Sequence, residues 1–192
     1  MDRRSEFQGL VRTYLDSVYN YALVLTRRTE DAEDLLQESL VRAYQGFDTF
    51  DRSLSFKPWM LTIVRNVQTD RQRRQRARPL EEAVGLDEAE PVVPMEGLLC
   101  SIPLAPEDIL LRRETVEQVR DAIRRLPPLL REIVELRDIE GLSYREIATV
   151  VGRPIGTVMS RLYRGRNLLR TYLIETSPRP GERGIGVRHD GL

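Results

Sequence analysis

Most of the six residues predicted to contact duplex DNA between positions 153 and 164 carry a hydroxyl or guanidinium group suited to that contact. Most of them recur at the spacing of a single helix face. A hydroxyl group can bond a base edge or a phosphate, and an arginine can bind guanine or a phosphate. The alternative is a solvated face on a bundle of helices. The predicted duplex-binding residues are Arg153, Pro154, Thr157, Ser160, Arg161 and Arg164.

A second group combines aromatic rings with arginines upstream of residue 78. Binding of single-stranded nucleic acid needs flat faces on which bases stack and cations along the backbone. The alternative is an ordinary helix whose aromatic rings are core and whose charges are solvated; for Trp59 we expect a core position in both cases. The predicted single-strand surface comprises Phe50, Phe56, Trp59, Arg65, Asn66, Asp70, Arg73 and Arg74.

A third group is acidic and lies near residue 34. Asp34 and Glu38 are four residues apart and share a helix face, with Asp31 and Gln37 nearby. Acidic residues in a first turn can simply complement the helix dipole. They can equally form a docking face for a basic protein partner, and the residues by themselves leave both interpretations open.

The duplex-binding residues need a helix-turn-helix to position them. Ser143 and Glu146 match a capping box, which fixes the start of a short helix. Gly152 and the two residues after it break that helix, and Ile155, Val158 and Leu162 give the next one a buried face. A short helix, a glycine-bearing turn and a second helix is the geometry that places a recognition helix in the major groove.

Helices also account for the first 78 residues. Apolar residues recur at spacings of three and four, and no segment alternates as a strand does, so we predict an all-α fold. The predicted buried faces are Leu10, Tyr14, Val18, Tyr21 and Leu25; Ala32, Leu36, Leu40, Ala43 and Phe47; and, on a helix beginning near Pro58, Trp59, Ile63 and Val67.

Charge and proline content divide the chain. Residues 51–78 hold eight basic and two acidic residues, whereas residues 79–108 hold eight acidic and no basic ones. We predict two small helical domains, 1–78 and 107–174, joined by a flexible acidic linker, 79–106, and followed by a disordered tail, 175–192. Part of the linker is apolar, which indicates packing on a domain or on a partner.

Several protein classes do not fit the sequence. No apolar stretch approaches the roughly 18 residues of a membrane helix, and the N-terminus does not resemble a secretory signal. The single cysteine, Cys100, cannot form an internal disulfide, which is compatible with the cytoplasm. Because no metal-ligand cluster or phosphate-binding loop is present, we predict no metal, no cofactor and no enzymatic activity.

The order of these motifs along the chain resembles that of the extracytoplasmic-function (ECF) group of bacterial sigma factors, within the sigma-70 family. The resemblance runs from about Phe7 to Arg170 and rests on DAEDLLQE, on the segment from Phe56 to Arg74, and on LPPLLREIVELRDIEGLSYREIA followed by GTVMSRLYRGR. It implies promoter recognition for core RNA polymerase, with single-stranded and duplex promoter DNA and an anti-sigma factor as further partners.

The resemblance also implies residue roles. The second segment would melt and recognise the minus-ten element, and the C-terminal domain would dock on the polymerase flap and recognise the minus-thirty-five element. The residues implied to bind the clamp coiled coil of the polymerase are Asp31, Asp34, Leu35, Gln37 and Glu38.

Two departures from the family pattern bear on these roles. Met159 replaces a residue that is most often basic or polar, so one phosphate or base contact is lost or replaced by an apolar one. Lys57-Pro58 before Trp59 is less usual and can shift the helix start. The alternatives to a sigma factor are a polymerase-independent helix-turn-helix regulator and a DNA recombinase.

Overall fold

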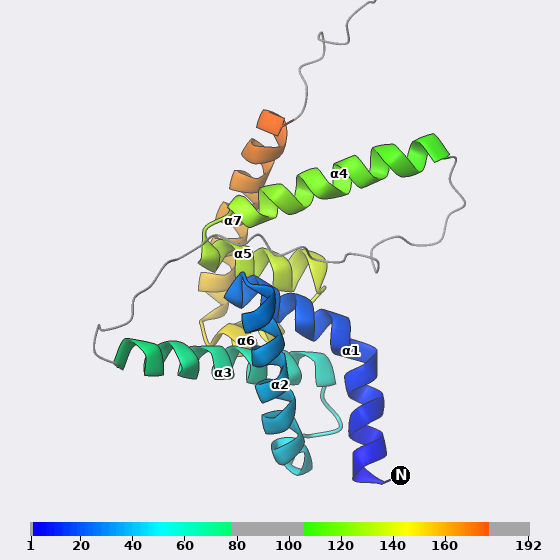
Figure 1. Cartoon of the computed structure of the whole chain (residues 1–192). Helices are drawn as coiled ribbons and strands as arrows, with labels where there is room; N and C mark the ends of the chain where they lie inside the picture. Colours follow the sequence, from blue (N-terminus) through cyan, green and yellow to red (C-terminus); the bar gives the residue numbers. More distant parts are fainter. Residues whose placement is uncertain (1, 78–105, 177–192) are drawn as a thin grey trace, which may run out of the picture.

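The computed structural model describes residues 2–77 and 106–176, and every regular element within these ranges is helical (Figure 1). This confirms the prediction of an all-α fold. The elements are α1 (Arg3–Thr26), α2 (Thr29–Gly46), the 3₁₀ turn η1 (Phe47–Thr49), α3 (Phe56–Ala77), α4 (Pro106–Arg125), α5 (Pro128–Val134), the π-helical turn η3 (Glu135–Ile139), α6 (Tyr144–Val151) and α7 (Ile155–Thr176).

The N-terminal unit consists of α1, α2 and α3, which pack against one another. The predicted stripes of α1 and α2 face this shared core. Val18, Tyr21 and Phe47 are at most 2% exposed, and the other members of both stripes are buried or packed against the core. Burial of these amphipathic faces is the main source of stability for such helices.

The buried face of α3 differs from the predicted one. The buried residues are Phe56, Met60, Leu61, Val64 and Val67. Trp59 and Ile63, predicted to be buried, are half-buried at the margin of the core. The helix begins two residues before Pro58, and its contacts with α1 and α2 of the same unit and with α6 of the C-terminal unit determine which residues are covered.

The C-terminal unit consists of α4 to α7, with α5 packed against α7. Gly165 of α7 makes this close approach possible, because a Cβ atom at that position would lie 2.8 Å from Cγ2 of Val134. The second helix of the predicted helix-turn-helix therefore rests on α5, and its opposite side faces outward.

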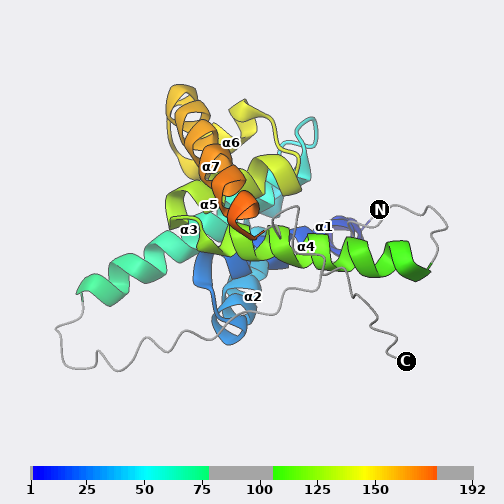
Figure 2. The same cartoon turned by 90° about the horizontal axis from the view of Figure 1, so that it is seen from above.

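The two units are in direct contact. α3 packs against α6, and α1 packs against α5 and η3. Viewed from above, α5 lies between α7 and α1 (Figure 2). The buried apolar side chains of both units belong to one continuous cluster. The sequence predicted two helical units, but it did not predict this contact.

Several predictions concern residues outside the described ranges. The acidic linker, except Pro106, lies there, as do Cys100 and nearly all of the C-terminal tail. Within residues 2–77 and 106–176, no helix is both long and apolar enough to span a membrane.

Candidate polymerase and nucleic-acid interfaces

Local signals in the sequence build the helix-turn-helix. The hydroxyl oxygen of Ser143 accepts from the backbone N–H of Glu146 at 3.3 Å, and the Glu146 carboxylate accepts from the backbone N–H of Ser143 at 2.7 Å. This is the predicted capping box, and it satisfies two helix-end donors. Gly152 ends α6 with φ at 59°, a left-handed conformation that favours glycine. The prediction of a short helix and a glycine turn is confirmed.

The outward face of α7 contains only part of the predicted duplex-binding set. Ser160 and Arg164 are exposed, whereas Thr157 and Arg161 are half-buried at its margin. Tyr163, which the sequence analysis did not select, is 70% exposed on this face. A tyrosine at helical spacing among arginines was the available signal, and the sequence analysis did not consider it.

Apolar side chains border the same face. Ile155, predicted to be buried, is 41% exposed, because the buried side of α7 begins at Val158. Met159 is 52% exposed. An exposed methionine at this position has no polar group to offer a phosphate, but it can contact a thymine methyl group in the major groove.

Three arginines of the predicted duplex-binding set make no ion pair within the described residues. Arg153, Arg161 and Arg164 occur in none of the salt bridges there, and the Arg164 Nε–H only contacts the Ser160 carbonyl of its own helix, at 3.4 Å. Pro154 and Arg153 are exposed at the turn. Because these cations have no acidic partner to exchange, binding to phosphate would require little rearrangement.

A shallow hollow lies between the C-terminal end of α2 and α3. Its volume is about 310 Å³, and the side chains that line it include Trp59, Ile63 and Asn66 of α3 and Arg42 of α2. A half-buried indole, an amide and a guanidinium around one hollow match the needs of an unpaired base: a stacking face, a hydrogen-bonding group and a cation.

Two aromatic residues predicted for this surface are buried. Phe50 and Phe56 are 5% and 4% exposed, so neither ring is accessible here. Their ring centroids lie 4.8 and 5.4 Å from that of Trp59, the distance of favourable aromatic contacts. Both rings therefore hold the Trp59 indole at the edge of the hollow. Periodicity could not distinguish these supporting rings from the indole that they support.

The charged residues of α3 point in different directions. Asp70 lies on the same side as the hollow and accepts from Arg42 at 2.9 Å. Arg73 and Arg74 are exposed near the end of the helix. Arg65, predicted to share a surface with Asn66, instead contacts Glu132 of the C-terminal unit at 2.5 Å.

The acidic face of α2 is only partly solvent-accessible. Asp31, Asp34 and Gln37 are exposed. Leu35, implied by the resemblance to touch the polymerase, has no exposed surface and belongs to the core. Glu38 is half-buried because two arginines cover its carboxylate.

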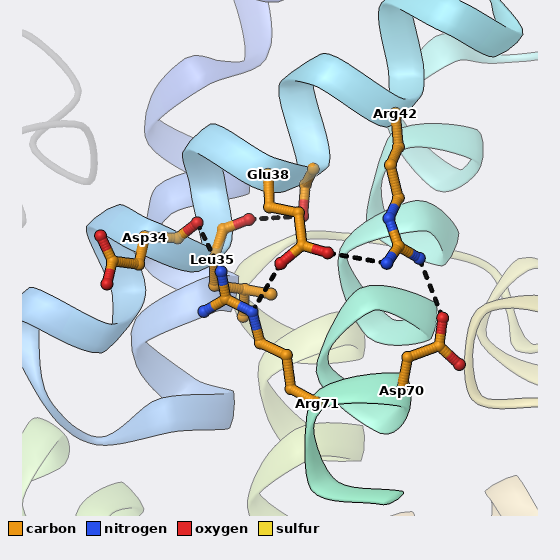
Figure 3. Close-up of polar contacts among 7 residues, drawn as sticks. Asp34, Leu35, Glu38, Arg42, Asp70 and Arg71 are labelled. Atoms are coloured by element: carbon orange, nitrogen blue, oxygen red, sulfur yellow. Dashed lines mark hydrogen bonds and ion pairs between the residues drawn. The ribbon is translucent and has the colours of Figure 1, made fainter. Parts of the chain in front are cut away.

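These arginines join the acidic face of α2 to α3 (Figure 3). Glu38 accepts from Arg42 at 2.7 Å and from Arg71 at 2.8 Å, and Arg71 also donates to the Asp34 carbonyl. Arg42 continues to Asp70. The sequence analysis missed both arginines. The i,i+4 spacing of Glu38 and Arg42 could have revealed the first, whereas Arg71 depends on how the helices pack.

The network shifts the ionisation of its carboxyl groups. The hydrogen bond from Arg42 lowers the pKa of Asp70. Burial alone would raise the pKa of Glu38, but the hydrogen bonds and charges of Arg71 and Arg42 outweigh it, and its pKa is lowered. In the C-terminal unit the shift is opposite: burial, followed by the charge of Glu140, raises the pKa of Glu135 to about 7.

Comparison with known families divides the chain in the same way. The family model described as Sigma-70 region 2 matches residues 10–78, which include α2 and α3. The model described as Sigma-70, region 4 matches residues 116–169, which include the helix-turn-helix.

Individual relatives match most of the chain. The ECF RNA polymerase sigma factor SigW of Bacillus subtilis is 31% identical, over 87% of this chain and 88% of its own length. The ECF RNA polymerase sigma factor SigE of Mycolicibacterium smegmatis is 39% identical over 88% of this chain, which spans 62% of that relative's length.

Solved structures show a similar arrangement. A chain in the co-crystal structure of the sigma factor RpoE with the anti-sigma factor NepR from Bartonella quintana has a TM-score of 0.66 and 28% identity, covering 90% of this chain and 99% of that one. The structure of CnrH with the cytosolic domain of CnrY, at 22% identity and a TM-score of 0.59, shares the fold. The sequence and structural matches together show that this chain belongs to the extracytoplasmic-function group of the sigma-70 family.

Proposed function

We propose that the chain directs transcription initiation by binding core RNA polymerase and recognising two promoter elements, one with each unit. The observation that carries this proposal is that one chain presents an exposed duplex-binding helix, α7, and a separate α2–α3 surface that combines an acidic face with a hollow of about 310 Å³. A polymerase-independent regulator would need only α7. A recombinase would need a catalytic centre, and family membership favours neither alternative.

Duplex recognition is assigned to the exposed face of α7. Ser160 and Arg164 lie at its centre, Thr157 and Arg161 at its margin, and Arg153 with Pro154 at the preceding turn. Contacts from these residues to base edges would fix the register of the minus-thirty-five element, and contacts to phosphates would add affinity without sequence preference.

Capture of an unpaired base is assigned to the hollow beside Trp59. Asn66 and Asp70 can donate to or accept from the base, and Arg73 and Arg74 can follow the strand. A base held there lowers the free energy of the melted minus-ten element, so melting follows from binding without chemistry by the protein. We infer from this that the chain has no enzymatic activity of its own.

Polymerase docking is assigned to the exposed acids Asp31 and Asp34, with Gln37 and Glu38 beside them. Leu35 contributes by holding α2 in place. The flap of the polymerase would meet the C-terminal unit, and an anti-sigma factor is a further proposed partner, because the matched RpoE structure contains one. A cytoplasmic location follows from binding polymerase and DNA.

Transcription reconstituted with bacterial core polymerase, this chain and a library of genomic fragments tests the proposal. We expect initiation that depends on the chain and reveals both promoter elements. Sequence-specific DNA binding without initiation or polymerase association would overturn it.

A matched pair of variants locates the docking face. Asp34→Asn should weaken polymerase association and leave the affinity for duplex DNA unchanged. Glu33→Gln is the control, because this exposed acid lies about 100° further round the same helix. Equal losses from both variants would argue against a defined acidic face.

A further inference from the structure

Three large apolar side chains form an exposed strip along the first turns of α7. Ile155, Met159 and Tyr163 are 41%, 52% and 70% exposed. Because they recur every four residues, they follow one edge of the helix, each about 40° round from the one before. Single exposed apolar residues are common on protein surfaces, but an aligned row of them indicates a contact surface.

The apolar strip borders the residues assigned to duplex DNA. Ser160 and Arg164, both exposed, directly follow Met159 and Tyr163 in the sequence. An α-helix seated in the major groove has base edges in front of it and a sugar-phosphate backbone on each side, so it contacts DNA through more than one row of side chains. DNA that is bound by the polar row would therefore also cover the apolar strip.

The charge of α7 favours DNA over a protein as the occupant of the strip. From Arg153 to Ile174 the chain holds five arginines and no acidic residue, a composition that attracts a phosphate backbone. Gly156, a surface neighbour of Met159, adds a second argument, because a Cβ atom at this exposed position would meet nothing within 4 Å. The missing side chain leaves room for a base edge to approach the helix closely.

The position and chemistry of Met159 suit one base in particular. Met159 lies in the second turn of α7, near the helix end whose residues contact base edges in a helix-turn-helix. Its thioether side chain is flexible and polarizable and has no hydrogen-bond donor. Thymine is the base that presents a methyl group, on C5, in the major groove, whereas an arginine at the same position would bind guanine.

We propose that Met159 is a specificity-determining residue that selects thymine at one position of the duplex element by packing on its C5 methyl group. Ile155 and Tyr163, one turn before and one turn after it, shield this contact from water. Discrimination at this position comes from the burial of apolar surface and not from a hydrogen bond. The inference rests on the proposed function, because it requires α7 to enter the major groove.

Removal of the methyl group tests the contact from the DNA side. The upstream promoter element is first selected from a random duplex pool by the full-length chain bound to core polymerase. Each thymine of that element is then replaced in turn by deoxyuridine, which lacks only the C5 methyl group, and affinity is measured by competition. We expect about a fourfold loss at one position, the effect of exposing one buried methyl-sized group. Unchanged affinity at every thymine would overturn the inference.

Two matched variants of the full-length chain test the contact from the protein side. Met159→Ala should weaken binding of the thymine element and abolish the methyl effect, so that thymine and deoxyuridine duplexes bind alike. Ile174→Ala is the control, because it truncates another exposed apolar residue of α7, 68% exposed and about 22 Å further along the helix. This control should keep the full methyl effect. A methyl effect of the same size in Met159→Ala would contradict the proposal.

A second measurement repeats the selection with Met159→Arg. The thymine should give way to a base pair that contains guanine, and a retained thymine would overturn the inference. Weaker polymerase association of Met159→Ala, together with indifference to deoxyuridine, would also overturn it by assigning the strip to a protein contact. Failure of the wild-type chain to select any element would refute the proposed function, whereas an element that is indifferent to its methyl groups would refute only this inference.

Discussion

The two helices proposed to bind DNA, α7 and α3, differ in whether their charged side chains form ion pairs. On α7, Arg161 and Arg164 make no ion pair within the described part of the chain. On α3, Arg65 and Arg71 are both paired with glutamates, and Asp70 is paired with Arg42. The comparison indicates that Arg161 and Arg164 can bind duplex DNA without giving up an ion pair, whereas Arg65 and Asp70 would have to exchange their partners.

The pKa values of carboxyl groups are shifted in opposite directions in the two units. Arginines lower the pKa values of Glu38 and Asp70 in the N-terminal unit, whereas burial raises that of Glu135 in the C-terminal unit. Glu38 and Asp70 therefore stabilise the fold above their ordinary pKa values, and this contribution is lost on acidification. Glu135 acts in the opposite sense: stability is greatest below pH 4.5 and falls as the pH rises through about 7.

The largest predicted effect sharpens this contrast in pH dependence. Glu135→Gln removes a carboxylate that is ionised at a cost above pH 7. A rise in pKa from 4.5 to about 7 corresponds to roughly 3.4 kcal/mol, which is the upper limit of the effect. We expect a gain in unfolding free energy approaching this limit at pH 8 and none at pH 4, measured by urea denaturation. The exposed-site control Glu33→Gln should show no such pH-dependent gain; a gain at pH 4 would indicate a different cause.

The next prediction tests whether Arg164 of α7 contacts the bases of duplex DNA. Arg164→Ala should weaken specific duplex binding by about 1–3 kcal/mol, because a bidentate arginine–base contact is lost. Binding titrations against the cognate and a scrambled element measure this. Arg170→Ala, which removes an exposed arginine from the same helix, should reduce affinity for both sequences alike. A non-specific loss with Arg164→Ala would make it a phosphate contact.

A smaller effect concerns the N-terminal cap of α6, the helix that precedes α7 in the helix-turn-helix. Ser143→Ala removes one half of the capping box and should lower stability by about 1 kcal/mol. Ser143→Asp, which can still accept from the Glu146 N–H, should retain most of it. Thermal unfolding of the three proteins decides the matter, and equal midpoints would mean that packing alone fixes α6.

The smallest predicted effect lies in the network of α2 and α3. Arg42→Gln should change stability by less than about 1 kcal/mol, because the pairs are partly exposed and screened. The pKa of Asp70, followed by NMR titration, should rise towards its ordinary value, since the Arg42 hydrogen bond is the first cause of its lowering. Arg74→Gln should move it less. An unchanged Asp70 pKa would show that the ion pair is not maintained in solution.

Much of the fold could be predicted from short stretches of sequence. The capping box at Ser143, the glycine at 152 and the stripes of α1 and α2 depend on residues only a few positions apart. Hydrogen bonds between neighbours and helical periodicity determine such features locally. For the same reason the order of motifs was enough to indicate the family.

The candidate sites were less predictable. Phe50, Phe56 and Leu35 carry the residue types of a binding surface, yet all three are at most 5% exposed. Tyr163 was omitted although it is well exposed. A residue type shows what a side chain can bind, but its accessibility depends on which helices cover it.

The sequence by itself thus determined the helices, their order and the chemistry available on each face, because neighbouring residues specify these features. Only the tertiary structure decided which charged side chains form ion pairs with one another. Glu132 and Arg65 are 67 positions apart, and Arg71 and Glu38 are 33 apart. Whether such groups meet depends on the angles at which helices pack and on how the two units dock, which no local pattern encodes.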